Sequence, residues 1–372
     1  MITTYATPGN MRLELLESVR ARGHEVTVIA PEPPESMAAA VTAFGGEYLQ
    51  WTVDRTAIDP ASDGAAMHQL NRLLRAHRPD VVLAYQIKAV LLAPIAAKLA
   101  RVGRVVALVN GLGSVFDDFG FGLTWKATVA RLGYRASLLA VDHVVFQNAD
   151  DPQLLLARRV LRKRASWETV PGTGVDVERF VEQPLPSGPP TFTLISRLLV
   201  SKGVRDFATA ARIVRASAPH ARFRLVGNLE KAGHPDAVAH EEIDRWVDEG
   251  VLDYLGFRAD VAELLAESTT FVLPSYYREG VPRTNLEALA IGRPIVTTDS
   301  VGCRDTVDDG RNGFLVAPRD PAALADRLLR YTREPSLAIR HGHSSRALAE
   351  AKFDIRLVNA QMRAALGLDA RS

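Results

Sequence analysis

The chain has 372 residues, which is long for one domain and comfortable for two of ordinary size. Its composition, 47% hydrophobic and 24% charged, is typical of a globular protein with substantial cores. A net charge of +2 gives no strong overall field and argues against a nucleic-acid-binding protein, while the single cysteine, Cys303, excludes an internal disulfide framework and fits a reducing compartment.

The N-terminal stretch MITTYATPGN lacks the basic region and the apolar run of a signal peptide. The apolar stretch 81–100 is interrupted by Lys88 and Lys98, so the chain has no run of about 18 apolar residues that could span a bilayer. We therefore expect a cytoplasmic protein, with any membrane contact peripheral. The first predicted strand is brief for a central strand, so a start further upstream remains open.

Strand and helix patterns alternate from the N-terminus, which predicts βαβ units and a parallel sheet. The predicted strands cover 1–5, 25–30, 80–85, 105–109, 142–147 and 167–171, and the predicted helices cover 11–22, 63–77, 89–101 and 149–160. Together they make a complete doubly wound α/β domain, which we predict to extend over residues 1–186.

The stretch QPLPSGPP, residues 183–190, can continue neither a sheet nor a helix, so we place the interdomain linker there. A second alternating set follows and predicts a second doubly wound domain over 187–354. Its strands are predicted at 191–195, 222–226, 251–254, 270–273, 295–298 and 314–316, and its helices at 204–216, 236–249, 261–267, 284–291, 304–307 and 321–331, with further helix from 335 to the end.

Two loops of this second domain carry charges where a ligand is expected. Residues 273–294 read as a strand end, a loop with Glu279 and Gly280, and a helix that begins after Pro282. In an open parallel sheet, ligands sit outside the carboxyl ends of the strands, and a helix N-terminus favours an anion. After the strand 191–195 come Arg197 and Lys202, two cations that can bind an anionic group, since Arg forks two oxygens and Lys is a point charge.

These two loops resemble known motifs. Residues 196–203 and 279–287 resemble the S-R-L-x-x-x-K-G and E-x7-E motifs of the retaining family-4 glycosyltransferases. The branch that adds an N-acetylhexosamine to a lipid-diphosphate-linked sugar looks closest. The resemblance implies the GT-B fold, in which two doubly wound Rossmann-like domains face a cleft. It also implies that the first domain binds the acceptor, that the second binds a UDP-sugar, and that the last helix, within 355–372, crosses back onto the first domain.

The resemblance also implies roles for the charged residues. Arg197 and Lys202 would hold the donor diphosphate, Glu279 the hydroxyls of the donor sugar, and Glu287 the ribose, because a carboxylate accepts hydrogen bonds from paired hydroxyls. The loop amides around Gly280 and Val281 would complete the sugar and phosphate site. The alternatives stay open: two solvated cations beside a helix start, a charge favoured near a helix N-terminus for Glu279, and for Glu287 a surface ion pair with Arg283 worth ~0.3 kcal/mol.

Two further loops resemble the nucleobase side of the family's donor site. They contain Gly227 with Asn228 and Phe257 with Arg258, each set following a predicted strand. Backbone groups there could read the base, and Phe257 or Arg258 could stack on it. Core packing is the alternative for Phe257.

The acceptor side departs from the family at one position. Many family members carry a catalytic-pocket histidine where this chain has Asn110, so a histidine base is in doubt; a retaining transfer can instead pass the acceptor's proton to the departing phosphate oxygen. Asp117 could orient the acceptor hydroxyl, with a solvated loop as the alternative. The acceptor-side candidates come from two loops that follow first-domain strands: Pro8, Gly9, Asn10, Asn110, Gly111, Gly113 and Asp117.

No metal site and no cofactor are predicted, because the acidic pairs are adjacent and lack the D-x-D spacing; the UDP-sugar is a substrate. A peripheral contact with anionic membrane is suggested by the mixed apolar and basic stretch 123–139 and by RRVLRKR at 158–164. The alternative is a solvated helix that covers its own core.

The sequence thus predicts a metal-independent retaining glycosyltransferase. It would move a hexose or N-acetylhexosamine from a UDP-sugar to a lipid-linked or glycan acceptor in surface polysaccharide synthesis, without a nucleic-acid partner. Two alternatives remain open: an enzyme similar to UDP-N-acetylhexosamine 2-epimerases, and a non-catalytic nucleotide-sugar-binding subunit.

Overall fold

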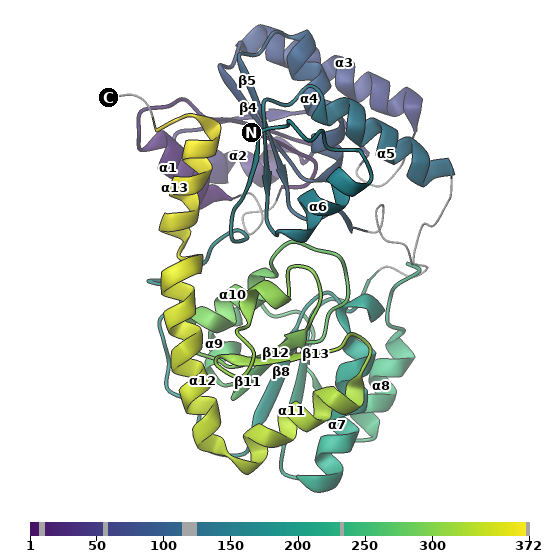
Figure 1. Cartoon of the computed structure of the whole chain (residues 1–372), viewed down its shortest axis with the longest axis vertical. Coiled ribbons are helices and arrows are strands. Elements are labelled where there is room, and N and C mark those ends of the chain that lie inside the picture. The colour runs from purple at the N-terminus through teal and green to yellow at the C-terminus, as the bar shows by residue number, and fades with distance from the viewer. Residues whose placement is uncertain (7–11, 55–58, 114–124, 231–233, 370–372) are drawn as a thin grey trace. The chain divides into compact units, whose positions relative to one another are not determined.

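The structure is a computed structural model that describes residues 1–6, 12–54, 59–113, 125–230 and 234–369 (Figure 1). The chain forms two compact units, one made of Met1–Thr173 with Arg356–Ser372 and the other of Gly174–Ile355. Each unit is built around its own parallel sheet.

The first unit contains a seven-stranded sheet in the order β3-β2-β1-β4-β5-β6-β7. The strands are β1 (Ile2–Thr3), β2 (Thr27–Ala30), β3 (Glu47–Gln50), β4 (Val81–Tyr85), β5 (Arg104–Val109), β6 (His143–Phe146) and β7 (Trp167–Thr169). The helices are α1 (Leu13–Arg20), α2 (Pro34–Thr42), α3 (Pro60–His77), α4 (Ile87–Leu99), α5 (Trp125–Leu138) and α6 (Asp150–Ala157).

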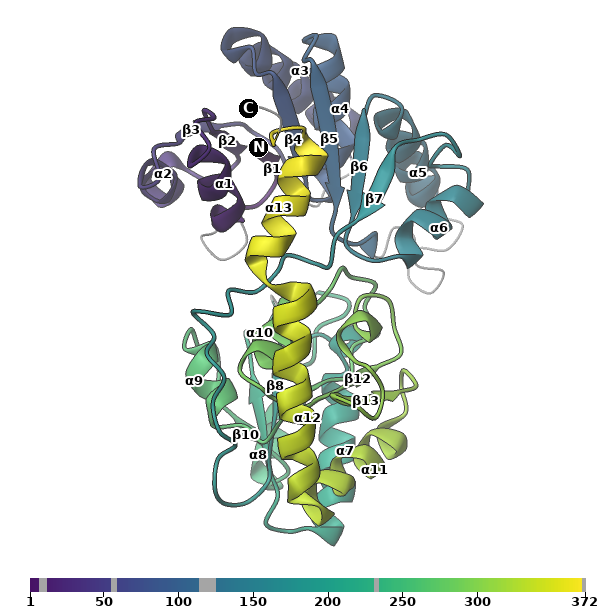
Figure 2. The same ribbon diagram turned by 60° about the vertical axis from the view of Figure 1, so that its left-hand side comes forward.

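Helices cover both faces of this sheet, which is why its strands are apolar on both sides. Along β4, Val82 and Ala84 pack with α3, α4, α5 and α6, while Leu83 and Tyr85 pack with α1 and α2. Figure 2 shows α1 on the same face as the C-terminal helix, α13 (Ile355–Leu366). No element was predicted from the sequence between residues 31 and 62, so β3 was missed, and so was α2, whose first residue is Pro34.

The C-terminal helix α13 packs within the first unit. Its Met362 belongs to the core below α1, its Ala365 carbonyl oxygen accepts a 2.8 Å hydrogen bond from Arg104, and its Arg363 donates to the Ser18 hydroxyl at 3.0 Å. Among the described helices, none has both the length and the hydropathy needed to cross a bilayer.

The second unit contains a six-stranded sheet in the order β10-β9-β8-β11-β12-β13. The strands are β8 (Thr191–Ile195), β9 (Arg222–Val226), β10 (Asp253–Tyr254), β11 (Thr270–Leu273), β12 (Ile295–Thr298) and β13 (Gly313–Val316). The α-helices are α7 (Val204–Ser217), α8 (His240–Asp248), α9 (Val261–Ala266), α10 (Arg283–Ala290), α11 (Pro321–Arg333) and α12 (Pro335–Leu348); the shorter turns are η2 (Val200–Lys202), η3 (Arg304–Thr306) and η4 (Ala349–Phe353).

The units divide at Thr173, whereas proline content placed the boundary at residue 186. Two arginines tie the intervening segment to the second unit. Arg293 is fully buried and donates to the carbonyl oxygens of Gln183 and Pro184 at 2.8 and 3.0 Å. Arg346 donates to the carbonyl oxygen of Phe180 at 2.7 Å. Prolines prevent regular structure here, yet backbone carbonyl groups of this segment still accept hydrogen bonds, and these attach it to the second unit.

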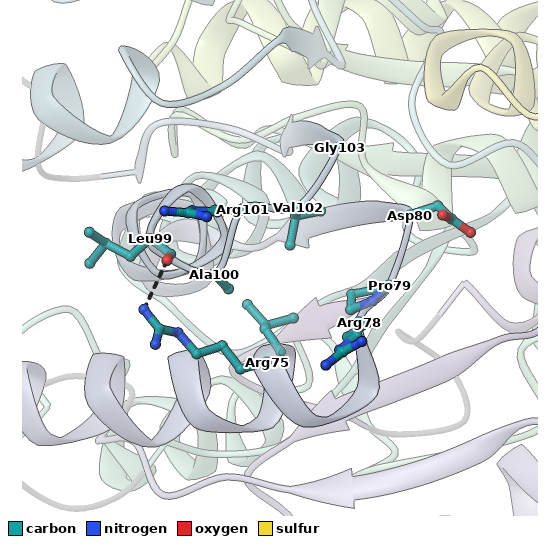
Figure 3. A pocket seen from close by; sticks show the side chains of 10 residues that line it. Arg75, Arg78, Pro79, Asp80, Leu99, Ala100, Arg101, Val102 and Gly103 are labelled. Carbon is teal, nitrogen blue, oxygen red and sulfur yellow. Dashed lines mark hydrogen bonds between the residues drawn. The ribbon is translucent and has the colours of Figure 1, made fainter.

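A hollow of about 660 Å³ lies at the amino edge of the first sheet, between the ends of α3 and α4 (Figure 3). Arg75 crosses one side of it and donates to the Leu99 carbonyl oxygen at 3.2 Å. Arg78 and Arg101 follow the two helices with left-handed φ values of 45° and 62° and are exposed. Ligands of parallel sheets bind at the carboxyl edge, so this hollow is on the wrong edge for the predicted site.

Candidate active site

The predicted donor residues follow the central strands β8 and β11 of the second unit. These two strands are direct neighbours, with Phe192 opposite Thr270 and Thr193 opposite Phe271. The strand order runs from β8 to β10 on one side and from β11 to β13 on the other, so the order reverses between them. Such a topological switch point is where open α/β sheets bind ligands.

The loop after β8 lies directly against the loop after β11. The Ser201 carbonyl oxygen accepts hydrogen bonds from the backbone N–H groups of Tyr276 and Tyr277 at 2.8 and 3.1 Å. Gly203 has φ 74°, and a Cβ there would lie 2.1 Å from the Pro274 carbonyl oxygen. Only glycine allows this approach, so Gly203 sets how closely the two loops meet.

Lys202 and Glu279 meet in this contact. The Lys202 Nζ lies 2.5 Å from Glu279 Oε1, and the Ser275 hydroxyl donates to the same oxygen at 3.2 Å. Both charged side chains are largely shielded, with 10% and 19% of their surfaces exposed. The ammonium also lies 5.5 Å from the centre of the Tyr277 ring. The lysine predicted for phosphate and the carboxylate predicted for sugar therefore occupy one small site, although they are 77 positions apart in the sequence.

Gly302 packs against the backbone of the loop that contains Glu279. With φ 78°, its Cα packs so closely that a Cβ would lie 2.1 Å from the carbonyl oxygen of Gly280. The Ser300 hydroxyl donates to the Ser275 carbonyl oxygen at 2.7 Å and holds the start of the same loop. The sequence prediction missed Gly302 as a site residue. Its signals were its place shortly after the strand β12 and within residues 299–305, a stretch that resembles a further motif of the same family, but neither reveals what the backbone touches.

Glu287 lies on the first turns of α10 and is buried, with 7% of its surface exposed. Arg283 Nε donates to Glu287 Oε1 at 3.0 Å, so the i,i+4 pair weighed in the sequence exists, but only its arginine is at the surface. Desolvation raises the pKa of Glu287, and the Arg283 charge opposes this rise. A surface ion pair does not require a buried carboxylate, so that alternative leaves the burial of Glu287 unexplained. A buried carboxylate paired with a cation can accept hydrogen bonds from hydroxyl groups.

Arg197 is separate from the Lys202 and Glu279 contact. Half of its side chain is exposed, and its Nη1 lies 3.4 Å from Glu230 Oε1 in the loop after β9. A long, exposed pair of this kind contributes about 0–1 kcal/mol, so exchange of Glu230 for a phosphate group costs little. The guanidinium is therefore available to a dianionic ligand without breaking a buried contact.

The base-side candidates fall into two groups. Gly227 is enclosed: a Cβ there would lie 1.8 Å from the Ser196 carbonyl oxygen, and Tyr254 donates to the Gly227 carbonyl oxygen at 3.0 Å. Asn228 is exposed, and its carbonyl oxygen accepts from Leu198 at 3.2 Å. These contacts fix the backbone that the sequence predicts beside the base.

Phe257 is 66% exposed, so the core-packing alternative for this residue is wrong. Arg258 forms an ion pair with Asp260, which lowers the pKa of that carboxyl group. The aromatic ring is thus available at the surface of its loop, while the neighbouring guanidinium already has a counter-ion.

In the first unit, Asn110, Gly111 and Gly113 follow β5, and the two glycines have φ values of 119° and 56°. The other acceptor-side candidates lie outside the described residues: Pro8, Gly9, Asn10 and Asp117. Across the described ranges, no three His, Cys, Asp or Glu side chains gather in a way that could hold a metal ion.

Two family models match the chain, a glycosyl transferase 4-like domain over residues 7–173 and a glycosyl transferases group 1 domain over residues 189–334. Among curated relatives, the N,N'-diacetylbacillosaminyl-diphospho-undecaprenol alpha-1,3-N-acetylgalactosaminyltransferase of Campylobacter jejuni is 25% identical over 86% of this chain and 85% of its own length. The UDP-Gal:alpha-D-GlcNAc-diphosphoundecaprenol alpha-1,3-galactosyltransferase of Escherichia coli is 28% identical over 74% of this chain and 72% of its own.

Solved structures share the fold at low identity. Anabaena HepE in complex with UDP and glucose aligns with a TM-score of 0.77 at 19% identity, over 98% of this chain and 99% of that chain. Sucrose-phosphate synthase from Thermosynechococcus elongatus also aligns at 0.77 and 19%, over 100% and 96%. The prediction of a GT-B fold built from two Rossmann-like units is confirmed. The chain therefore belongs to the glycosyltransferases that join a 4-like domain to a group 1 domain, and it is an enzyme of glycosyl transfer.

Proposed function

We propose that this enzyme transfers a hexose or N-acetylhexosamine, with retention, from a UDP-sugar to a lipid-diphosphate-linked or glycan acceptor during surface polysaccharide synthesis. The observation that carries the donor assignment is the 2.5 Å contact of Lys202 with Glu279 at the switch point between β8 and β11. A cation suited to phosphate and a carboxylate suited to hydroxyl groups are thus close enough to contact the same sugar diphosphate.

The donor would be held at three points. Arg197 and Lys202 neutralise the charge that grows on the departing diphosphate, Glu279 accepts hydrogen bonds from the sugar hydroxyls, and Glu287 accepts them from the ribose. Exposed Phe257 provides a face for the base. Because two cations and the start of α10 supply positive charge, we propose that no divalent metal and no further cofactor are needed. Full activity in excess EDTA supports this, and loss restored by magnesium contradicts it.

The transfer itself needs no enzymatic base in this proposal. The bond from the anomeric carbon to the diphosphate oxygen breaks, and the acceptor oxygen bonds to that carbon from the same face. The acceptor's hydroxyl proton passes to the departing phosphate oxygen, and UDP leaves. Asn110, which stands where a histidine was expected, can orient a hydroxyl group but cannot remove its proton.

The acceptor class is supported by the relatives' names. Both the Campylobacter and the Escherichia coli enzymes act on sugars linked through a diphosphate to undecaprenol. We propose the same class here, at the cytoplasmic face of the membrane. The direct experiment measures UDP release from a panel of UDP-sugars with and without polyprenyl-diphosphate sugars. Acceptor-dependent release supports the proposal, whereas acceptor-independent conversion of the UDP-sugar would favour an epimerase.

A membrane contact of the first unit is part of the same proposal. Val129, Leu132 and Leu139 are 42%, 61% and 44% exposed, and their spacing places them on one side of α5 and the turn after it. The helix α6 lies beside α5 in both ribbon views and leads into a basic segment (Figures 1 and 2). Four exposed cations occupy that segment: Arg159, Arg162, Lys163 and Arg164. Apolar side chains next to cations suit an anionic lipid surface.

Liposome sedimentation tests this contact. A variant neutralised at Arg162, Lys163 and Arg164 is expected to leave anionic vesicles, since each basic residue near such a surface contributes about 1 kcal/mol. A matched variant neutralised at the exposed Arg75, Arg78 and Arg101 of the amino edge loses the same charge elsewhere. Equal partitioning of both variants and wild type would refute the contact.

A further inference from the structure

The first sheet has its own switch point, between β1 and β4, because the strand order runs β1-β2-β3 on one side and β4-β5-β6-β7 on the other. The donor residues do not occupy this position, and the sequence singled out no charged residue here. Two residues flank it in unusual backbone conformations, Arg12 after β1 and Gln86 after β4, with φ values of 52° and 75°. Strained residues of this kind concentrate at functional sites.

Gln86 joins the two strands across the switch point. Its side-chain nitrogen donates to the Tyr5 carbonyl oxygen at 2.9 Å, and its side-chain oxygen accepts from the backbone N–H of Thr4 at 3.2 Å. The strain at Gln86 is thus explained by the contacts that it makes. The two hydrogen bonds of Gln86 hold the backbone in place at the carboxyl edge of the sheet.

The left-handed conformation and the burial of Arg12 are not explained by comparable contacts within the described residues. Only 6% of its surface is exposed, its Nη2 reaches the Thr173 carbonyl oxygen at 3.5 Å, and its buried Nη1 has no hydrogen-bond partner in the described part of the chain. Thr173 follows β7, so the guanidinium runs along the carboxyl edge of the sheet. Lys88, a buried cation at the same edge, differs because Asp63 lies 2.6 Å from its ammonium.

A buried guanidinium with an unused donor is costly unless a ligand completes it. Burial lowers the pKa of Arg12 by desolvation, and nearby Tyr85 and Glu14 only oppose that shift. A guanidinium remains charged at neutral pH even so, and its paired N–H groups match phosphate oxygens. Arg12 also precedes α1, whose first N–H groups favour an anion.

We propose that Arg12 binds a phosphate group at the first sheet's switch point, and that this phosphate belongs to the diphosphate of the acceptor. The second part rests on the proposed function, because it takes the acceptor to be diphosphate-linked. The donor diphosphate is the other source of the same chemistry, and the experiment separates the two.

The kinetic arm compares Arg12→Met, which keeps most of the side-chain volume, with wild type. Loss of a hydrogen bond from a charged group is expected to raise the acceptor KM about 10- to 100-fold, with the donor KM unchanged. Arg12→Lys should recover part of the loss, because it restores the charge without the fork. Arg78→Met is the matched control: Arg78 also has a left-handed φ, but it is exposed at the amino edge, and its kinetics should equal wild type.

The binding arm needs no turnover. With saturating UDP on the donor site, a short-chain prenyl diphosphate is titrated against the full-length protein, and the prenyl alcohol of equal length serves as the uncharged probe. Wild type should bind the diphosphate more tightly than the alcohol, and Arg12→Met should bind both alike. Thermal unfolding of the same variants shows that each one is folded.

Three results would overturn the inference. One is equal diphosphate binding and acceptor KM in wild type and Arg12→Met. Another is a rise confined to the donor KM, which would assign Arg12 to the donor. The third is a wild-type enzyme that transfers sugar to a diphosphate-free glycan and does not bind the prenyl diphosphate, which would leave the glycosyltransferase proposal standing and remove this one.

Discussion

The two switch points of this enzyme differ in how far the protein satisfies its own charges. Between β8 and β11, Lys202 pairs with Glu279, and nearby Glu287 pairs with Arg283. Between β1 and β4, Arg12 is buried, and its Nη1 has no hydrogen-bond partner among the residues that the structure describes. When the charges of a site pair with each other, their burial costs little folding free energy, but a ligand must replace these pairs in order to bind. A site with an unmatched buried charge is less stable and has its binding group ready.

The largest expected effect on the rate is at the switch point between β8 and β11, where Lys202 pairs with Glu279. Lys202→Met removes the cation that we propose neutralises the departing diphosphate, and loss of such a contact lowers kcat about 100- to 1,000-fold. The KM for the UDP-sugar should change less, since the charge grows mainly in the transition state. Single-turnover rates and UDP titration separate the two quantities. A kcat within threefold of wild type would remove Lys202 from the site.

Gly302→Ala tests whether backbone packing positions Glu279. Its Cβ would lie 2.1 Å from the Gly280 carbonyl oxygen, so the loop must move, and misplacement of about 1 Å can cost about a hundredfold in rate. Gly310→Ala is the matched control, because Gly310 has φ 75° against 78° but open space around its Cβ position. Both variants should lose stability through strain, and only Gly302→Ala should lose the rate. Equal rates in the two would show that this support is irrelevant.

The pH dependence of UDP binding tests Glu287. Desolvation raises its pKa, so the carboxylate that we propose binds ribose is lost as the pH falls through that raised value, and UDP affinity should fall with it. Arg283→Met removes the opposing charge and should move the midpoint of this loss to higher pH. The folded state holds this proton more tightly than the unfolded state, so the group's contribution to stability declines as the pH rises past the unfolded pKa. An unshifted midpoint in UDP titrations would contradict the assignment.

The smallest expected effect is on the free energy of unfolding, at the switch point between β1 and β4. Arg12→Gly relieves a left-handed backbone and removes a buried charge, so the free energy of unfolding should rise by about 1 kcal/mol, while the acceptor KM should rise as it does in Arg12→Met. Arg78→Gly relieves a similar φ at an exposed residue and should stabilise less. Denaturant unfolding measures both. A destabilised Arg12→Gly would show that the guanidinium serves the fold.

The same contrast explains what the sequence could predict. Apolar runs between turn residues located most strands, and the strand, loop and helix around Glu279 identified the donor motif. The contact between Glu279 and Lys202 follows because β8 and β11 are neighbours. Residues 31–50 were assigned no element: α2 begins at Pro34 within a proline-rich stretch, and β3 is a short strand at the edge of the sheet.

What the sequence could not predict depends on contacts between distant residues. Gly302 matters only because the Gly280 carbonyl group lies against it. The unit boundary depends on Arg293 and Arg346, whose hydrogen bonds tie down a proline-rich stretch. Arg12 is one of many arginines, and neither its left-handed φ nor its missing partner has a signature in the sequence.

The most direct test of the donor site is a comparison of wild type with Glu279→Gln. The substitution keeps the size of the side chain and removes the charge that contacts Lys202 and that we propose binds the sugar. Transfer from a UDP-sugar to a polyprenyl-diphosphate sugar is followed as acceptor-dependent UDP release. We expect release by wild type and a loss of about a hundredfold in the variant. Equal rates in both proteins would contradict the assignment of this site.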